Sequence, residues 1–236
     1  MDSLETLRKE NYRCIINKIK DKYAANNKSL RGFDVGCARG WFMDEAKKQN
    51  IKMDGIEPEK NFFNEAELYG ENVINGLFPQ DFNLDAKYDF IIFNDVFEHL
   101  PDLNAALKKC NELLKPDGLL IINCPDSRGV FFKIARALKS LKICSYWRRL
   151  WQMDFYSPHL WYFNEKNLTL MAEKYNFKYD LGFKLKTVTF TGLKDRVMCS
   201  SKNFISGYIT YLMLLVASPF LKILPEDVIC VIFKKN

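Results

Sequence analysis

Small residues close two short apolar runs near the start of the chain, in a spacing that can hold a nucleoside cofactor. Residues 34–40 read Asp-Val-Gly-Cys-Ala-Arg-Gly, and residues 55–58 read Gly-Ile-Glu-Pro. Gly36, Ala38 and Gly40 leave room for a ligand to lie against the backbone, and the helix after such a turn begins with free amide donors. An acid about 20 residues after the turn, at the tip of the next strand, is how α/β folds hold a ribose. The pattern therefore predicts a site for an adenosine-type cofactor.

The turn differs from the two commonest nucleotide-binding motifs. The dinucleotide fingerprint is Gly-x-Gly-x-x-Gly, whereas residues 36–40 carry alanine at the second glycine position, and no Gly-Lys-Ser/Thr follows. A pyrophosphate is therefore disfavoured and a P-loop is excluded. Asp34 can orient the turn or a water near a charged part of the cofactor, and Glu57 can accept hydrogen bonds from both ribose hydroxyls. A purely structural turn beside a solvated glutamate is the weaker interpretation.

The elements that must position these residues alternate between strands and helices. Apolar periodicity and turn signals predict strands at 32–35, 52–56, 72–74, 88–93 and 119–123, helices at 3–23, 41–49, 60–69 and 101–114, and a turn at 115–118. Strands that alternate with helices of this length imply a parallel sheet covered on both faces. The expected fold class is therefore α/β.

Composition limits the kind of protein. With 236 residues and 48% hydrophobic content, the chain can bury one large core. The 35 basic and 29 acidic residues give a net charge of +6, which favours an anionic partner without requiring nucleic acid. Seven scattered cysteines without a Cys-x-x-Cys pair argue for reduced thiols in the cytoplasm and against a zinc site. The charged N-terminus has no apolar segment of a secretory signal.

Four segments together resemble the successive motifs of class I S-adenosylmethionine (SAM)-dependent methyltransferases. They are residues 34–40, 55–58, 88–102 (Tyr-Asp-Phe-Ile-Ile-Phe-Asn-Asp-Val-Phe-Glu-His-Leu-Pro-Asp) and 113–122 (Leu-Leu-Lys-Pro-Asp-Gly-Leu-Leu-Ile-Ile). The resemblance is closest to the branch with ubiquinone-type and glycan-modifying O-methyltransferases. It implies a Rossmann-like, doubly wound, mostly parallel seven-stranded sheet with an antiparallel last strand at 227–235 and a helical lid insert. It also implies SAM as the cofactor and S-adenosylhomocysteine (SAH) as its product.

The resemblance assigns roles to single residues as well. It places the methionine part of SAM on the glycine turn, the ribose on the acid after the second strand, and the adenine on the loop after the third. The amino group or the transferred methyl falls at the end of the fourth strand. The methionine part thus falls to Asp34, Gly36, Ala38 and Gly40, and the ribose to Glu57 and Pro58. The adenine falls to Leu77 and Phe78, and the amino group or methyl to Asn94 and Asp95. Because many relatives have an aspartate where this chain has Leu77, Asp81 is a further candidate for the adenine amino group. No metal ligand set is expected.

Two histidines are candidates for a general base. Methyl transfer is an in-line displacement at a sulfonium, so a hydroxyl acceptor must be aligned and must lose a proton. A neutral histidine suits that task at pH 7. His159 lies in a segment that resembles the family's return from the lid and is the first candidate. His99 follows the fourth strand, where family members often carry the same residue close to the cofactor, and is the second. Asp95, at the end of that strand, is a further catalytic candidate. Either histidine could instead be structural.

We expect a single methyltransferase domain whose lid mixes aromatic and basic residues. Its parts are an N-terminal helix (1–28), a cofactor-binding core (29–125), the lid insert (126–163) and a C-terminal half (164–236). Within the lid, residues 131–151 combine helical apolar spacing with basic side chains and no acid. Its aromatic rings could bind a sugar or an aromatic acceptor, with arginine on a phosphate, or they could form a small lid core with a solvated basic face.

The segment 203–224 is apolar and has no charged residue before position 222. By length it could span a bilayer, but Gly207, Ser218 and Pro219 interrupt it and a strand must follow it. A buried helical hairpin or an interfacial segment is therefore favoured. Together with the basic lid, it predicts a cytoplasmic protein in peripheral contact with the inner face of the membrane, with no nucleic-acid partner.

These inferences predict a SAM-dependent methyltransferase that O-methylates a sugar, a phosphorylated metabolite or a surface-glycan precursor, as in capsule or lipopolysaccharide biosynthesis. A lipid-linked acceptor would fit the expected membrane contact. The first alternative is a quinone or prenyl-phenol O-methyltransferase, which the aromatic and apolar C-terminal half favours. The second is a non-catalytic SAM-binding partner subunit.

Overall fold

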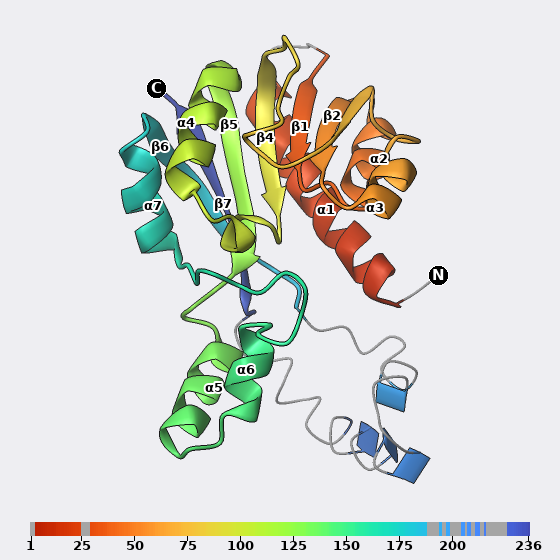
Figure 1. Cartoon of the computed structure of the whole chain (residues 1–236). Coiled ribbons are helices and arrows are strands. Elements are labelled where there is room, and N and C mark those ends of the chain that lie inside the picture. Colours follow the sequence, from red (N-terminus) through yellow and green to blue (C-terminus); the bar gives the residue numbers. More distant parts are fainter. Residues whose placement is uncertain are drawn as a thin grey trace.

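In the computed structural model, the described residues form a seven-stranded sheet with helices on both faces (Figure 1). The structure describes residues 3–24, 29–187 and 226–236, together with ten single positions between 194 and 215. The strand order is β3-β2-β1-β4-β5-β7-β6. The strands are β1 (Arg31–Val35), β2 (Lys52–Glu57), β3 (Asn72–Asn75), β4 (Tyr88–Asn94), β5 (Leu114–Pro125), β6 (Phe177–Leu185) and β7 (Val228–Lys235).

Strand pairing confirms the predicted α/β fold with its antiparallel last strand. The first five strands pair in parallel, and β7 runs antiparallel to both β5 and β6. The register sets Val35 opposite both Ile56 and Phe93, and Asn94 opposite Asn123. The carboxyl ends of β1, β2, β4 and β5 therefore meet at one edge of the sheet, where ligands bind in folds of this type.

The helices cover the two faces of the sheet because successive strand residues point to opposite sides. Ile91 of β4 joins the core under α4 and α7, whereas its neighbour Ile92 joins the core under α1, α2 and α3. Ile15, Ile16 and Ile19 of α1 are completely buried in the second of these cores. The helices are α1 (Ser3–Tyr23), α2 (Trp41–Lys47), α3 (Lys60–Ala66), the short 3-10 helix η2 (Phe97–His99), α4 (Leu103–Leu113) and α7 (Glu165–Glu173).

Several element boundaries differ from the predicted ones. The fourth predicted helix begins at Leu103 instead of 101, because the Asp102 carboxylate caps it by accepting from the Ala105 amide at 2.9 Å. The predicted turn at 115–118 is part of a continuous β5, where a register shift against β4 and a positive φ of 61° at Asp117 take up the bend. The helices after β1 and β2 end two and three residues early, and β6 had no predicted range.

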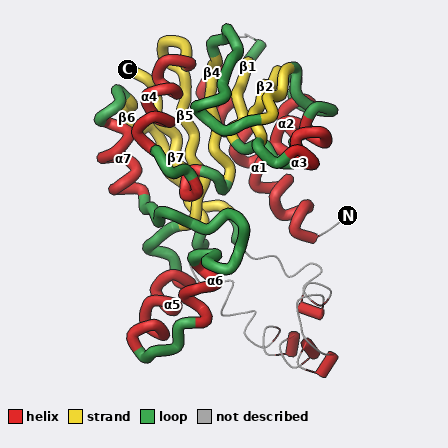
Figure 2. Tube along the Cα trace, in the orientation of Figure 1, coloured by secondary structure: helices red, strands yellow, loops and turns green. Residues whose placement is uncertain are grey.

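The lid insert contains two helices, α5 (Val130–Ser140) and α6 (Ser145–Leu150), which project beyond the carboxyl ends of the strands (Figures 1 and 2). Only seven single positions of the predicted apolar segment 203–224 are described, so the predicted hairpin or interfacial helix lies outside the described residues. Among the helices that the structure describes, none combines the length and the apolar character needed to cross a membrane.

Candidate functional site

β1 turns sharply into α2 over residues 36–40. Gly36 and Gly40 have φ angles of +68° and +74°, in the left-handed region that glycine tolerates best. A Cβ on Gly36 would also come within 2.6 Å of the Val96 side chain, so backbone and packing both require glycine there. The Gly36 amide donates to the Ile56 carbonyl at 2.8 Å. The turn is therefore fixed against the end of β2.

Glu57 ends β2 and directs its side chain at the glycine turn. One carboxylate oxygen accepts from the Ala38 amide and the other from the Glu59 amide, each at 2.9 Å. A carboxylate offers about four lone-pair sites, so both oxygens can still accept from ribose hydroxyls. Burial raises the pKa of Glu57, and the two amide hydrogen bonds oppose that rise. Pro58 follows at the surface, and its carbonyl accepts from the Asn75 side chain at 3.1 Å.

A pocket with about 530 Å³ of empty space, open mouth included, lies between the glycine turn, α1 and the end of β4. Asp34, Ala38 and Asn94 line its sheet side, and Arg8 and Tyr12 of α1 line the opposite side. Arg8 has no ion pair with any residue that the structure describes, so its guanidinium can meet a ligand carboxylate. Sequence reasoning missed both α1 residues, because helical periodicity shows which face is buried but not which site that face covers.

Asp34 ends β1 with only 2% of its surface exposed. The Asn94 side-chain nitrogen lies 3.4 Å from Asp34 Oδ1, while Asn94 Oδ1 is buried without a hydrogen-bond partner in the described chain. Burial raises the pKa of Asp34 to about 8, the Asn94 hydrogen bond opposes this, and the charge of Glu57 adds to it. A buried acid beside an unpartnered amide oxygen suits a cationic ligand group, such as the ammonium of a methionine. These residues fit SAM.

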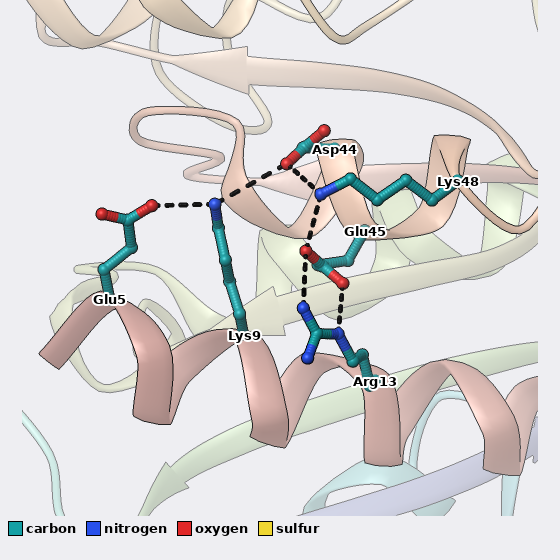
Figure 3. Close-up of polar contacts among 6 residues, drawn as sticks. All are labelled: Glu5, Lys9, Arg13, Asp44, Glu45 and Lys48. Atoms are coloured by element: carbon teal, nitrogen blue, oxygen red, sulfur yellow. Dashed lines mark hydrogen bonds and ion pairs between the residues drawn. The ribbon is translucent and has the colours of Figure 1, made fainter. Parts of the chain in front are cut away.

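Ion pairs hold α1 over this pocket (Figure 3). Arg13 of α1 contacts the Glu45 carboxylate of α2 at 2.6 Å, and Lys9 reaches Asp44 at 3.7 Å. Lys48 contacts both of these α2 acids, at 2.7 and 2.9 Å. Although burial acts to raise it, the hydrogen bonds from Arg13 and Lys48 keep the pKa of Glu45 below its ordinary value. The network therefore positions the helix that carries Arg8.

The loop after β3 carries the residues expected at the adenine. Leu77 is 58% exposed, and its amide donates to the Asp81 carboxylate at 2.7 Å. Phe78 is buried, with its ring centroid 6.0 Å from those of Phe33 and Phe93. The structure thus leaves Leu77 at the surface and places Phe78 in the core. Adenine contact by Leu77, Phe78 or Asp81 stays a prediction.

A cluster of titratable side chains follows β4 in η2 and extends into the lid. The rings of His99 and His159 have centroids 4.8 Å apart. Glu98 is 1% exposed, and neither carboxylate oxygen has a hydrogen-bond partner among the described residues. Burial, with Asp95 nearby, raises the pKa of Glu98 well above its ordinary value, which favours the neutral acid. Burial also raises the pKa of Asp95, while the nearby Arg8 and His99 act to lower it.

Hydrogen bonds define the tautomer of His159. The Gln152 side-chain nitrogen, a donor, lies 2.9 Å from His159 Nε2. The Tyr162 hydroxyl lies 3.2 Å from Nδ1 and donates its own proton to the Leu150 carbonyl. His159 therefore carries its proton on Nδ1, and its Nε2 lone pair is occupied. Burial and the nearby His99 lower the pKa of His159 to about 4.

His99 differs from His159 in that its Nε2 nitrogen accepts no hydrogen bond from the described residues. Its Nδ1 lies 2.9 Å from the Pro158 carbonyl, which can only accept, and 3.2 Å from the Ser157 hydroxyl. Nδ1 therefore carries the proton, and the Nε2 lone pair has no hydrogen-bond partner in the described chain. Backbone contacts hold the ring in place from the lid side, since the Leu160 amide donates to the Glu98 carbonyl at 2.9 Å. His99 thus offers a fixed, open acceptor nitrogen.

Glu98, His99 and His159 are also the one group in the described part of the chain that could ligate a metal ion, with donor atoms within 4.8 Å of one another. Carboxylate and imidazole are both ligands for divalent cations. Sequence reasoning expected no such set, because it relied on cysteine spacing. The three residues come from two segments far apart in the chain, so no local motif marks them.

A second pocket lies between α5, α6 and the ends of β5 and β7, with about 1240 Å³ of empty space including its mouth. We call it the lid pocket. Its wall is mostly apolar, and His159 and Arg149 are among its polar members. The apolar side chains include Phe131, Phe132, Ile134, Tyr146, Leu150 and Tyr162. His159 therefore joins the histidine pair to this pocket.

The lid aromatics divide into rings that pack on one another and rings that stay exposed. Trp147 and Trp151 pack with centroids 5.5 Å apart, and Phe132 lies 4.8 Å from Tyr162, which forms a small lid core. Other rings of the insert, such as Tyr146 at 60% exposure, stay at the surface. The aromatic cluster is thus partly structural and partly open to a ligand.

The chain matches the model of a protein family described as "Methyltransferase domain" over residues 7–181. This match covers more than half of the chain, and the chain belongs to that family. The fold and the fit of the first pocket agree with SAM as its cofactor.

Curated relatives are distant. The chain is 22% identical over 116 residues to the ubiquinone biosynthesis O-methyltransferase of Bradyrhizobium diazoefficiens, covering 45% of this chain and 44% of that protein. It is 27% identical over 118 residues to the enzyme of the same name from Coxiella burnetii, covering 46% and 50%. The matched region thus spans half or less of these relatives' length.

Solved structures share the fold over nearly the whole chain. The magnesium protoporphyrin IX methyltransferase of Synechocystis PCC 6803, with bound SAH, superimposes with a TM-score of 0.59 at 12% identity, covering 100% of this chain and 88% of that one. A SAM-dependent methyltransferase from Archaeoglobus fulgidus gives 0.54 at 16% identity, covering 95% and 94%. At these identities the likeness concerns the fold alone.

Proposed function

We propose that this protein transfers the methyl group of SAM to a hydroxyl of an acceptor whose body is apolar. The observation that carries the proposal is the lid pocket, in which His159 lines a mostly apolar wall while its ring lies with its centroid 4.8 Å from that of His99. An apolar wall with a few polar groups is typical of sites for apolar small molecules. The names of the distant relatives point to the same class of acceptor, a ring with a hydroxyl group.

The residues of the first pocket would hold the cofactor, and SAM supplies an electrophilic methyl on a sulfonium. The ionised Asp34 would face the ammonium group and the Arg8 guanidinium would meet the carboxylate. Glu57, which is hydrogen-bonded to Ala38 of the pocket wall, would accept from the ribose. These contacts orient the donor, which is the main contribution a protein makes to a displacement of this kind.

His99 is the better general base of the two candidates. Its Nδ1–H is held by the Pro158 carbonyl and its Nε2 is open, whereas the Nε2 of His159 already accepts from Gln152. The structure therefore favours the reverse of the order expected from the sequence. When His99 takes the hydroxyl proton, the resulting imidazolium favours the ionised form of the nearby Asp95 carboxyl, against the burial that raises the pKa of that group.

Substitution of each histidine tests the assignment. His99→Ala should lower the rate of methyl transfer at saturating SAM by about 100-fold or more, the usual contribution of a positioned base. His159→Ala should lower it by less than about tenfold, because its Nε2 is occupied. SAM affinity measured by calorimetry serves as the control and should be unchanged in both variants. A larger loss in His159→Ala would return the role to His159, and small losses in both would refute base catalysis by histidine.

The acceptor class is tested by SAH formation with two groups of compounds. Prenyl-substituted catechols and hydroquinones should support turnover, whereas free sugars and sugar phosphates should not, because their hydroxyls would leave water for an apolar wall. Turnover of the sugars would establish instead the glycan-directed activity expected first from the sequence. SAM binding without turnover of either group would identify a non-catalytic SAM-binding subunit.

A further inference from the structure

Residues 130–156, whose exposed side chains we call the lid surface, expose large apolar side chains at high density. Leu141 is 70% exposed and Phe155 is 64% exposed. α5 buries only Ala135 among its described side chains, and α6 buries none. The exposed apolar side chains of this segment are Phe131, Ile134, Leu141, Ile143, Tyr146, Met153, Phe155 and Tyr156. Apolar side chains normally lie scattered on a soluble surface, whereas a concentration of this kind marks a docking site.

The same segment is strongly basic. It contains six lysines and arginines and a single acid, Asp154, which pairs with Arg148 at 2.5 Å. The other five have no carboxylate partner among the described residues: Lys133, Arg136, Lys139, Lys142 and Arg149. Lys139 lies over the Trp147 ring at 4.2 Å, so its charge stays close to the apolar side chains. An apolar face with unpaired basic residues around it complements an anionic, amphipathic partner.

We propose that the lid surface docks on an anionic lipid bilayer. The apolar side chains would enter the boundary between headgroups and acyl chains, and the lysines and arginines would meet the lipid phosphates. A second copy of the chain fits less well, since it would bring the same basic charges face to face. The chain's own residues 188–225 also fit less well, because they contain four basic residues and one acid and so add no negative complement.

Docking in this orientation would turn the mouth of the lid pocket toward the bilayer. Phe131, Ile134 and Tyr146 are both exposed on the lid surface and part of the pocket wall. An acceptor with an apolar body could then pass from the membrane into the pocket without crossing water. This second step rests on the proposed function, whereas the docking itself does not.

Flotation of the full chain with liposomes tests the proposal. The protein should float with vesicles of phosphatidylcholine and phosphatidylglycerol, and should remain behind with phosphatidylcholine alone. The triple variant Lys133→Gln, Arg136→Gln and Lys142→Gln should lower the partition coefficient by about 100-fold, because each basic residue near an anionic surface contributes roughly a fivefold factor. The double variant Leu141→Ser and Phe155→Ser should also float poorly, which separates apolar insertion from charge attraction alone.

A matched triple variant on other surfaces provides the control. Lys52→Gln, Lys166→Gln and Lys178→Gln removes the same charge from exposed positions outside the lid and should float like the wild type. Flotation of the lid triple at the wild-type level, or equal loss in both triples, would overturn the docking proposal. A lid-dependent change in molecular mass by sedimentation, without flotation, would assign the surface to a second copy instead.

SAM binding by calorimetry shows that each variant is folded. A variant that no longer floats but still binds SAM has lost the docking surface and not its fold. Wild-type flotation without turnover of any apolar acceptor would contradict the proposed function and leave the docking in place. The two proposals therefore fail separately.

Discussion

SAM binding should depend on pH through Asp34. The pKa of this carboxyl is raised to about 8 by burial, so below pH 8 it is mostly neutral in the free protein. The cofactor brings a cationic ammonium and a sulfonium, which favour the ionised form. Binding should therefore expel the Asp34 proton, and the apparent dissociation constant should scale inversely with the ionised fraction.

The size of the effect follows from the pKa of about 8. The ionised fraction of such a group is about 1% at pH 6 and about 9% at pH 7, so the dissociation constant for SAM should fall about ninefold over this one unit. This range lies below the pH at which an α-amino group loses its proton, so the cofactor's own titration does not interfere. Across it, each mole of SAM bound should release about 0.9 mole of protons or more.

Calorimetry in two buffers of different ionisation enthalpy measures both quantities in one set of titrations. Asp34→Asn removes the titrating group while keeping its shape, and should bind SAM with a dissociation constant that is flat between pH 6 and 7. A flat wild-type profile, or a slope that persists in Asp34→Asn, would refute the reasoning. Glu57→Gln gives the comparison for the second acid of the site, whose pKa is also raised by burial.

Three further predictions concern stability and the turn. The pKa of Asp34 is higher in the folded than in the unfolded protein, so the neutral acid stabilises the fold at low pH. The free energy of unfolding should therefore fall as pH rises toward 8, by up to about 1.4 kcal/mol per pH unit. Urea unfolding of cofactor-free Asp34→Asn should not show this fall. Gly36→Ala should destabilise the protein by about 1–3 kcal/mol and weaken SAM binding, because φ is +68° and the new Cβ would clash with the Val96 side chain. A SAM affinity of Gly36→Ala equal to that of the wild type by calorimetry would contradict this. Arg13→Met should cost no more than about 1 kcal/mol in urea unfolding, because the Arg13 side chain is 54% exposed and Lys48 remains as a partner of Glu45. A double-mutant cycle with Glu45→Met should give a coupling energy of that size, and a coupling near zero would argue against the ion pair.

The sheet could be predicted because its signals are local. β4 contains the apolar run 90–93, which is buried on both faces, and the turn after β1 carries glycines where φ is positive. The boundaries that differed depend on details beyond periodicity, such as the Asp102 cap. β6 was not predicted, because its burial is mixed along the strand and its sequence has no clear alternation of apolar and polar residues.

The candidate site was predictable to a smaller extent. Asp34 and Glu57 follow directly from motif spacing, and the structure brings both to one edge of the sheet. The participation of Arg8 depends on how α1 packs, and the choice between His99 and His159 depends on which ring nitrogen is occupied. Such information exists only in three dimensions.

The position of β7 has a consequence for how the chain folds during translation. β7 is the last strand made, yet it lies between β5 and β6 and is the sheet neighbour of both. Until residues 228–235 leave the ribosome, β6 has no strand to pair with and the edge of β5 stays open. Vectorial folding can therefore complete the cofactor half early, while the half beside the lid must wait until residues 228–235 have been made.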